Sequence, residues 1–131
     1  MVILDTNIII DHLQLSQQKE SQLMRLVKSN PKETLALSVI SVQELYEGIS
    51  TRSQDKEQYL LATISPLKIV PYTYEVAQLA GEIARDRNRP IELADAAIAA
   101  TAILNGAQLY TLNAKDFKDI PQLELAIVDR Q

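Results

Sequence analysis

Four acidic residues of this 131-residue sequence stand beside apolar segments in a way that suggests metal chemistry. Asp5, Glu44 and Asp116 each follow a short apolar segment, and Asp95 lies near the start of an alanine-rich one. Carboxylates gathered within about 4 Å repel by roughly 4 kcal/mol per pair at an effective dielectric of ~20, so a cluster takes up protons or binds cations. Hard oxygen ligands select Mg²⁺, Mn²⁺ or Ca²⁺ rather than Zn²⁺. Bound Mg²⁺ keeps open positions for phosphate oxygens and can activate a water, so these residues predict phosphodiester hydrolysis.

The segments around these acids are expected to alternate between strand and helix. The apolar pattern predicts strands at 2–4, 35–39, 67–70, 109–112 and 125–128. It predicts helices at 6–15, 53–64 and 93–104, and three more that begin at Ser16, Ser41 and Thr73. Asn105-Gly106 is a typical C-terminal stop for helix 93–104. This alternation indicates a mostly parallel sheet with helices on both faces. The length fits one domain over residues 1–131.

On this interpretation the four acids lie at one edge of the sheet. Asp5 lies at the carboxyl end of the first strand, and Asp116 lies just beyond the strand that ends near Leu112. Glu44 is expected in the first turn of the helix that begins at Ser41, and Asp95 in the first turn of helix 93–104. Ligands of open parallel sheets bind outside the carboxyl ends of the strands, so we expect these side chains to meet in one crevice.

Each acid also has a purely structural interpretation. Asp5 could be a helix N-cap, and Glu44 completes a capping-box pattern with Ser41. Asp95 could complement a helix dipole, and Asp116 could be an exposed turn residue. Four such coincidences at corresponding strand ends are less expected than one shared site.

The composition excludes several other functions. Cysteine is absent, which removes disulfides, zinc–thiolate sites and a cysteine nucleophile. His12 is the only histidine, so a two-histidine ribonuclease mechanism is excluded, and we expect this residue on a solvated helix face. Neither G-x-x-x-x-G-K-[ST] nor G-x-G-x-x-G occurs. The net charge of −4 argues against an extended surface for duplex DNA.

Nothing in the sequence indicates export or a membrane. The N-terminus reaches Asp5 without the basic start and long apolar run of a signal peptide. No stretch approaches the ~18 consecutive apolar residues of a membrane span. We therefore expect a cytoplasmic protein.

Four segments together resemble the PIN domain, and within it the toxins of VapC type. These segments are VILDTNIIIDHL, SVISVQELYEGI, IELADAAIAATAILNGAQLYTLNAKDF and LELAIV. They span nearly the whole chain, in the order and spacing of that family. The resemblance implies a three-layer α/β/α sandwich and an Mg²⁺- or Mn²⁺-dependent endoribonuclease.

The resemblance also implies roles for particular residues. It assigns acidic ligand roles to Asp5, Glu44 and Asp95, and supporting roles to Thr6 and Asn7. The fourth position stays open, because many relatives have an acid directly after the threonine-containing strand. This chain has Asn113 there, which brings no charge, and Asp116 three residues later.

The implied partners are an RNA substrate, a cognate antitoxin and a second copy of the chain in a homodimer. The antitoxin is expected to insert a segment into or beside the active groove, and DNA to be contacted only through it. Six cationic residues could contact RNA phosphates, although each could equally be a solvated surface charge: Arg52, Lys56, Arg85, Arg87, Arg89 and Lys115. The leading alternative function is a catalytically silent subunit of a DNA-binding, autoregulatory complex. A processing nuclease outside any toxin system is a third.

Overall fold

Five parallel strands form the centre of the fold. The computed structural model describes residues 1–15 and 19–126. The strand order is β3-β2-β1-β4-β5, and every neighbouring pair runs parallel. The strand bounds are β1 Val2–Leu4, β2 Leu35–Ser38, β3 Lys68–Val70, β4 Gln108–Tyr110 and β5 Glu124–Leu125. Residues 127 and 128, also predicted as strand, lie outside the described residues.

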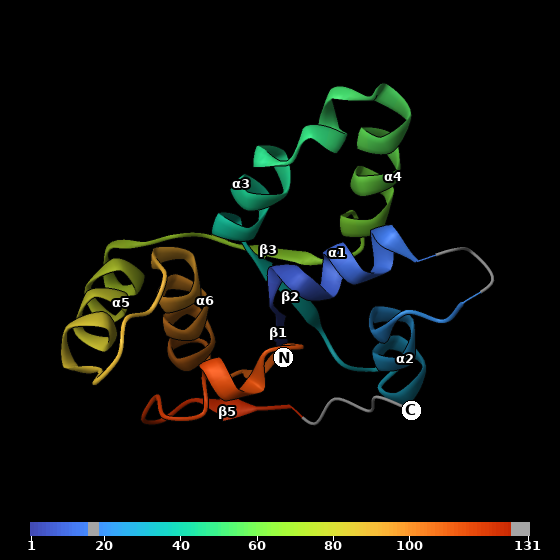
Figure 1. Ribbon diagram of the computed structural model, residues 1–131. Helices are drawn as coiled ribbons and strands as arrows, with labels where there is room; N and C mark the ends of the chain where they lie inside the picture. The colour runs from blue at the N-terminus through green and yellow to red at the C-terminus, as the bar shows by residue number, and fades with distance from the viewer. Residues whose placement is uncertain (16–18, 127–131) are drawn as a thin grey trace.

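Helices cover both faces of this sheet, as Figure 1 shows. The α-helices are α1 Thr6–Gln14, α2 Gln22–Ser29, α3 Val39–Glu47, α4 Gln54–Ile64, α5 Tyr74–Asp86 and α6 Leu93–Leu104. Two 3₁₀ helices follow α3 and β4, namely η1 Ile49–Arg52 and η2 Ala114–Asp116. The predicted α/β/α sandwich with a parallel sheet is confirmed.

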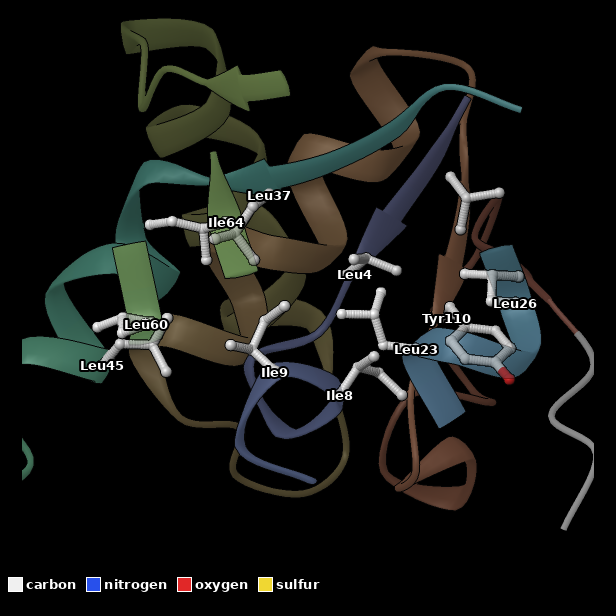
Figure 2. Close-up of a cluster of buried hydrophobic side chains, with 11 residues drawn as sticks. Leu4, Ile8, Ile9, Leu23, Leu26, Leu37, Leu45, Leu60, Ile64 and Tyr110 are labelled. Atoms are coloured by element: carbon white, nitrogen blue, oxygen red, sulfur yellow. The ribbon is translucent and has the colours of Figure 1, made fainter. Parts of the chain in front are cut away.

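Each face of the sheet has its own apolar core, because successive side chains of a strand point to opposite faces. Leu4 belongs to a buried cluster that also includes side chains of α1, α2 and α4, such as Ile8, Leu26 and Leu60 (Figure 2). Ile3, one residue earlier, packs on the other face with α6 and the segment after β4. β1, which Asp5 directly follows, is thus packed against apolar side chains on both of its faces.

Serine and threonine caps set where the helices begin. Ser53 and Thr73, where the sequence predicts helix starts, accept hydrogen bonds from backbone N–H groups in the first turns of α4 and α5. The prediction that Ser41 begins the next helix is wrong, because Ser38 caps α3 and places the helix start three residues earlier. The cap of α2 is Ser21, and the predicted Ser16 lies outside the described residues.

Gly106 and His12 differ in how well the sequence predicts their environment. Gly106 adopts φ +60° directly after the Asn105 cap of α6, which confirms the predicted stop. His12 was expected on a solvated helix face, and it is half-buried there, with both ring nitrogens in contact with neighbouring hydroxyls. Its Nδ1 lies 2.7 Å from the Ser21 hydroxyl and its Nε2 3.2 Å from the Tyr59 hydroxyl, because α2 and α4 both pack beside α1.

Candidate active site

Asp5 lies where the direction of the strand order reverses. The chain moves from β1 to β2 and β3 on one side and then returns to β4 on the other, and such switch points are where open α/β sheets bind ligands. The Asp5 backbone N–H donates to the Tyr110 carbonyl of β4 at 2.9 Å. Its carboxylate accepts from the Thr6 N–H at 2.8 Å and from the Thr111 hydroxyl at 2.7 Å.

The Asp5 carboxylate is therefore a helix cap and a buried acid at once. The residue is only 4% exposed. Burial raises its pKa; hydrogen bonds from Thr111 and Thr6 act against this, and the negative charges of Glu44 and Asp116 add to it. The structural and functional interpretations of Asp5 are thus compatible, because the cap uses one carboxyl oxygen and Thr111 the other.

Glu44 points back toward Asp5 through Thr6. The Thr6 hydroxyl donates to Oε1 of Glu44 at 2.6 Å and lies 2.8 Å from the buried Ser41 hydroxyl. The alternative interpretation of Glu44 as part of a capping box is therefore wrong, since Ser41 lies inside α3 and its hydroxyl contacts Thr6. Glu44 is consequently not in the first turn, but its carboxylate still reaches the end of β1.

Asp95 has a strongly raised pKa. It is partly buried in the first turn of α6, as expected. Its pKa is raised from 3.8 to about 6, first by desolvation and then by four neighbouring negative charges: Asp5, Glu44, Glu92 and Asp116. The four acids singled out in the sequence are thus close enough to repel one another, and Glu92 is a fifth that sequence reasoning missed.

Asp116 borders a small hollow together with Asp95. This hollow, of about 190 Å³, is lined by Arg87, Arg89, Pro90, Ile91, Glu92, Asp95 and Asp116. Asp116 is exposed and ends η2, so it is also the turn residue of the alternative interpretation. Asn113 precedes η2, makes no side-chain cap bond there, and does not line the hollow.

Two polar residues hold the ends of β1 and β4 together. Asn7 accepts from the Leu112 N–H at 3.3 Å, and its amide nitrogen lies 3.5 Å from the Thr111 hydroxyl. Thr111 was missed in the sequence, although a threonine at the end of an apolar strand is a usable signal. Asn7 was expected as a supporting residue, and its contacts link α1 to the segment directly after β4.

The donor chemistry of these residues suits a hard divalent cation. No ion pair within residues 1–15 and 19–126 involves Asp5, Glu44, Asp95 or Asp116, so their charge is not neutralised there. In the same part of the chain, no three Asp, Glu or His side chains form a ready-made cage for one ion. Mg²⁺ is usually held by one or two carboxylates and keeps several waters, so it does not require such a cage. The residues therefore fit Mg²⁺ or Mn²⁺ by charge and ligand type.

No helix in the described part of the chain has the length and apolar character needed to cross a bilayer.

Comparisons with known proteins agree with this fold. The PIN-domain profile matches residues 2–123. The chain is 34% identical to Ribonuclease VapC10 of Mycobacterium tuberculosis over 95% of this chain and 91% of the relative. It is 32% identical to Ribonuclease VapC2 of Rickettsia felis over 97% of each.

A solved structure agrees as well. It is VapBC2 from Rickettsia felis bound to a DNA fragment from their promoter, with a TM-score of 0.81, 30% identity and 98% coverage of both chains. Profile, sequence and structure thus lead to the same group. The chain belongs to the PIN-domain family and groups there with VapC ribonucleases.

Proposed function

We propose that this protein is the ribonuclease toxin of a toxin–antitoxin pair, and that it hydrolyses RNA phosphodiester bonds with Mg²⁺ or Mn²⁺. Its similarity to VapC ribonucleases supports the endoribonuclease activity and the toxin role. Asp5, Glu44, Asp95 and Asp116 are the proposed ligands. The observation that carries the metal dependence is that these carboxylates lie near one another without an ion-pair partner in residues 1–15 and 19–126. Asp95 and Asp116 border one hollow, and the pKa of Asp95 is raised to about 6 by burial and by the neighbouring negative charges.

The protein's own side chains prepare this site. Asp5 is held by two donors, the Thr6 N–H and the Thr111 hydroxyl, so its carboxylate cannot turn away from the end of β1. Thr6 also orients Glu44 through its hydroxyl. When bound, the cation would neutralise phosphate oxygens and lower the pKa of a water. Thr6, Asn7 and Thr111 act through the ligands, and such supporting contacts typically change metal affinity or activity by roughly 10- to 100-fold.

Asp116 is better supported than Asn113 as the fourth ligand. Its charge contributes to the raised pKa of both Asp5 and Asp95, and it borders the hollow that Asp95 also borders. The Asn113 backbone N–H instead donates to the Thr111 hydroxyl at 3.0 Å. Asn113 therefore supports Thr111 in this proposal, and Asp116 supplies the charge.

The proposed partner is an antitoxin that occupies a groove beside the acids. A hollow of about 480 Å³ lies between α1, α3 and α4 and is lined by Ile10, Leu13, Gln14, Glu44, Leu45, Gly48, Ser50, Lys56, Tyr59 and Leu60. Its apolar side chains suit the apolar face of a partner helix. Glu44 belongs to both this groove and the acidic site, so a bound segment would reach the ligands. Structural relatives of this chain were solved as VapBC complexes.

The proposed substrate and assembly follow the same family assignment. The protein acts on RNA, contacts DNA only through its antitoxin because its own net charge is −4, and forms a homodimer. Light scattering on the purified chain tests the homodimer, and a monomer at micromolar concentration contradicts it.

Brief expression of the chain in a bacterial host tests the proposed activity. The wild-type protein should arrest growth and produce new RNA ends at defined positions, mapped by sequencing. Asp95→Asn should produce neither, because it removes a ligand charge from the site. Asp55→Asn, an exposed acid on α4, should behave like the wild type. Equal growth arrest and equal RNA ends from wild type and Asp95→Asn would reject the proposed site.

The silent-subunit alternative predicts a different outcome of the same experiment. It is favoured by the relative that was solved on promoter DNA. Under that alternative, wild type and Asp95→Asn both leave growth and RNA unchanged, while the complex with the antitoxin still represses its promoter. The experiment therefore separates the two functions.

A further inference from the structure

The loop between α5 and α6 is tied to the segment that carries Asp116. The guanidinium of Arg87 is buried, with its side chain only 5% exposed. Its Nη2 donates to the Asp116 carbonyl and, at 2.5 Å, to the Asp119 carboxylate, which Nε also reaches at 3.2 Å. Arg89 adds a hydrogen bond from Nη2 to the Lys115 carbonyl at 2.6 Å. We refer to Arg87, Arg89 and their three partners as the arginine clamp.

The segment that the clamp holds has little internal support. η2 has three residues, and the backbone bonds that close it run from the Asp116 N–H to Asn113 and from the Phe117 N–H to Ala114. Carbonyls at the end of a helix lack partners within that helix and carry partial negative charge. The two guanidinium groups supply the donors that the Lys115 and Asp116 carbonyls need. Phe117, which is 1% exposed, anchors the segment only from the core side.

The clamp also connects the segments of two acids. The loop that carries Arg87 and Arg89 leads directly into α6, where Asp95 lies in the first turn. Arg87 and Arg89 border the same hollow as Asp95 and Asp116. The hydrogen bond from Arg87 to the Asp116 carbonyl therefore ties the Asp116 segment to the loop that leads to Asp95.

We propose that Arg87 is a positioning residue, which binds the Asp116 backbone and thereby holds the Asp116 carboxylate beside Asp95 for a shared cation. This inference rests on the proposed function. It also gives the Arg87 side chain a role other than contact with an RNA phosphate. When Arg87 is replaced, the direction in which cation affinity changes separates a positioning role from a purely electrostatic one. Removing a positive charge near an acidic site strengthens cation binding by electrostatics alone, whereas losing a positioning contact weakens it.

Titration of the purified protein with Mn²⁺ tests this role, with free Mn²⁺ measured by electron paramagnetic resonance. Arg87→Met should weaken Mn²⁺ binding by roughly 10- to 100-fold. Arg87→Lys keeps the charge but loses the planar fork that reaches two acceptors, so it should weaken binding as well. Arg85→Met is the matched control: Arg85 pairs with Asp86 at the surface and should leave affinity unchanged. Tighter binding by Arg87→Met with unchanged binding by Arg87→Lys overturns the proposal.

A double variant asks whether Arg87 acts through Asp116. If it does, Arg87→Met should add little to the loss of Mn²⁺ affinity caused by Asp116→Asn, because the carboxylate being positioned is already absent. Independent losses that multiply in the double variant indicate a merely structural role and overturn the proposal.

Hydrogen exchange of the metal-free protein tests the arginine clamp independently of the proposed function. The Asp116 and Phe117 amides should exchange faster in Arg87→Met than in wild type or Arg85→Met, since their turn has lost its outer support. Unchanged exchange overturns the clamp even where wild type binds Mn²⁺ and cleaves RNA. If wild type neither binds Mn²⁺ nor cleaves RNA, the proposed function fails and Arg87 has no metal ligand to position.

Discussion

Asp95 lies in the first turn of α6, partly buried and near other negative charges. A carboxyl group whose pKa is raised on folding binds its proton more tightly in the folded state than in the unfolded state. Its contribution to stability is therefore present below the ordinary value of 3.8 and is lost as the pH rises to about 6. At neutral pH without metal, the charged Asp95 carboxylate destabilises the protein.

Asp95→Asn should consequently stabilise the metal-free protein at pH 7, by about 1 kcal/mol because partial exposure weakens the repulsion. The advantage should shrink at pH 4, where the wild-type carboxyl is largely protonated. Urea unfolding with EDTA at both pH values measures it, with the exposed acid substitution Glu124→Gln as the control. An equal effect at both pH values contradicts the repulsion.

Thr6 tests how far the ligands depend on their support. Thr6→Val keeps the shape of the side chain but removes the donor to Glu44, so RNA cleavage should fall by roughly 10- to 100-fold. The loss of a hydrogen bond to a charged group should also lower the free energy of unfolding by about 1.5–3 kcal/mol. Thr6→Ser retains the hydroxyl and should recover most of the activity. Equal activity of the valine and serine variants contradicts a role for this hydrogen bond.

The site residues differ in how well the sequence foretells them. Asp5 and Asp95 are predictable because strand ends and helix starts are visible in the apolar pattern. The hydrogen bonds from Thr111 to Asp5 and from Arg87 to Asp116 are not predictable, since each joins distant segments. Glu92 differs from them, because it lies only three residues before Asp95 and its place at the start of α6 is a local signal. Thr111 and Asp5 are 106 positions apart, and nothing local to either residue indicates the pairing.

Among the elements, α3 shows why helix starts are hard to place. Ser38 and Ser41 are both good caps, and Ser41 has a glutamate three residues later. Tertiary contacts decide between them. Both serines are buried, but the Ser41 hydroxyl lies 2.8 Å from the Thr6 hydroxyl, whereas the Ser38 hydroxyl accepts from the Ile40 N–H. The error moved the helix start but kept Glu44 on the same helix.

Two glycines predict opposite effects of the same substitution. Gly106→Ala should destabilise the protein by about 1–2 kcal/mol, because an alanine at φ +60° is strained even with no atom within 4 Å of its Cβ. Gly81→Ala, inside α5 and also without a close neighbour, should stabilise it by about 0.5–1 kcal/mol. Thermal unfolding of both variants measures this, and the same sign for both contradicts the assigned backbone conformations.

For the whole molecule, the parallel sheet is predictable from the sequence and its strand order is not. Short apolar strands that alternate with helices are enough to indicate a parallel sheet. The order β3-β2-β1-β4-β5 depends on which strands pair, and that information lies in the pairing of residues such as Val2 with both Leu35 and Gln108. That a single domain spans residues 1–131 stays a prediction.

Metal binding should stabilise the whole fold, because the proposed ligands come from four separate elements or their ends. At 100 times its dissociation constant, a cation stabilises by about 2.7 kcal/mol, on the order of 10 °C in melting temperature for a chain of this size. Scanning calorimetry with and without Mn²⁺ measures the shift. The Asp95→Asn protein should show a smaller one, and equal shifts would mean that the cation binds elsewhere.

The central claim is that converging carboxylates and a divalent cation cleave RNA, and cleavage of total bacterial RNA by the purified chain tests it most directly. The wild-type protein should cut with Mg²⁺ or Mn²⁺ and stop when EDTA is added, while Asp95→Asn, correctly folded by its urea transition, should be at least about 100-fold slower. Cleavage by wild type that persists in EDTA, or an Asp95→Asn protein that cuts as fast as wild type, would contradict it.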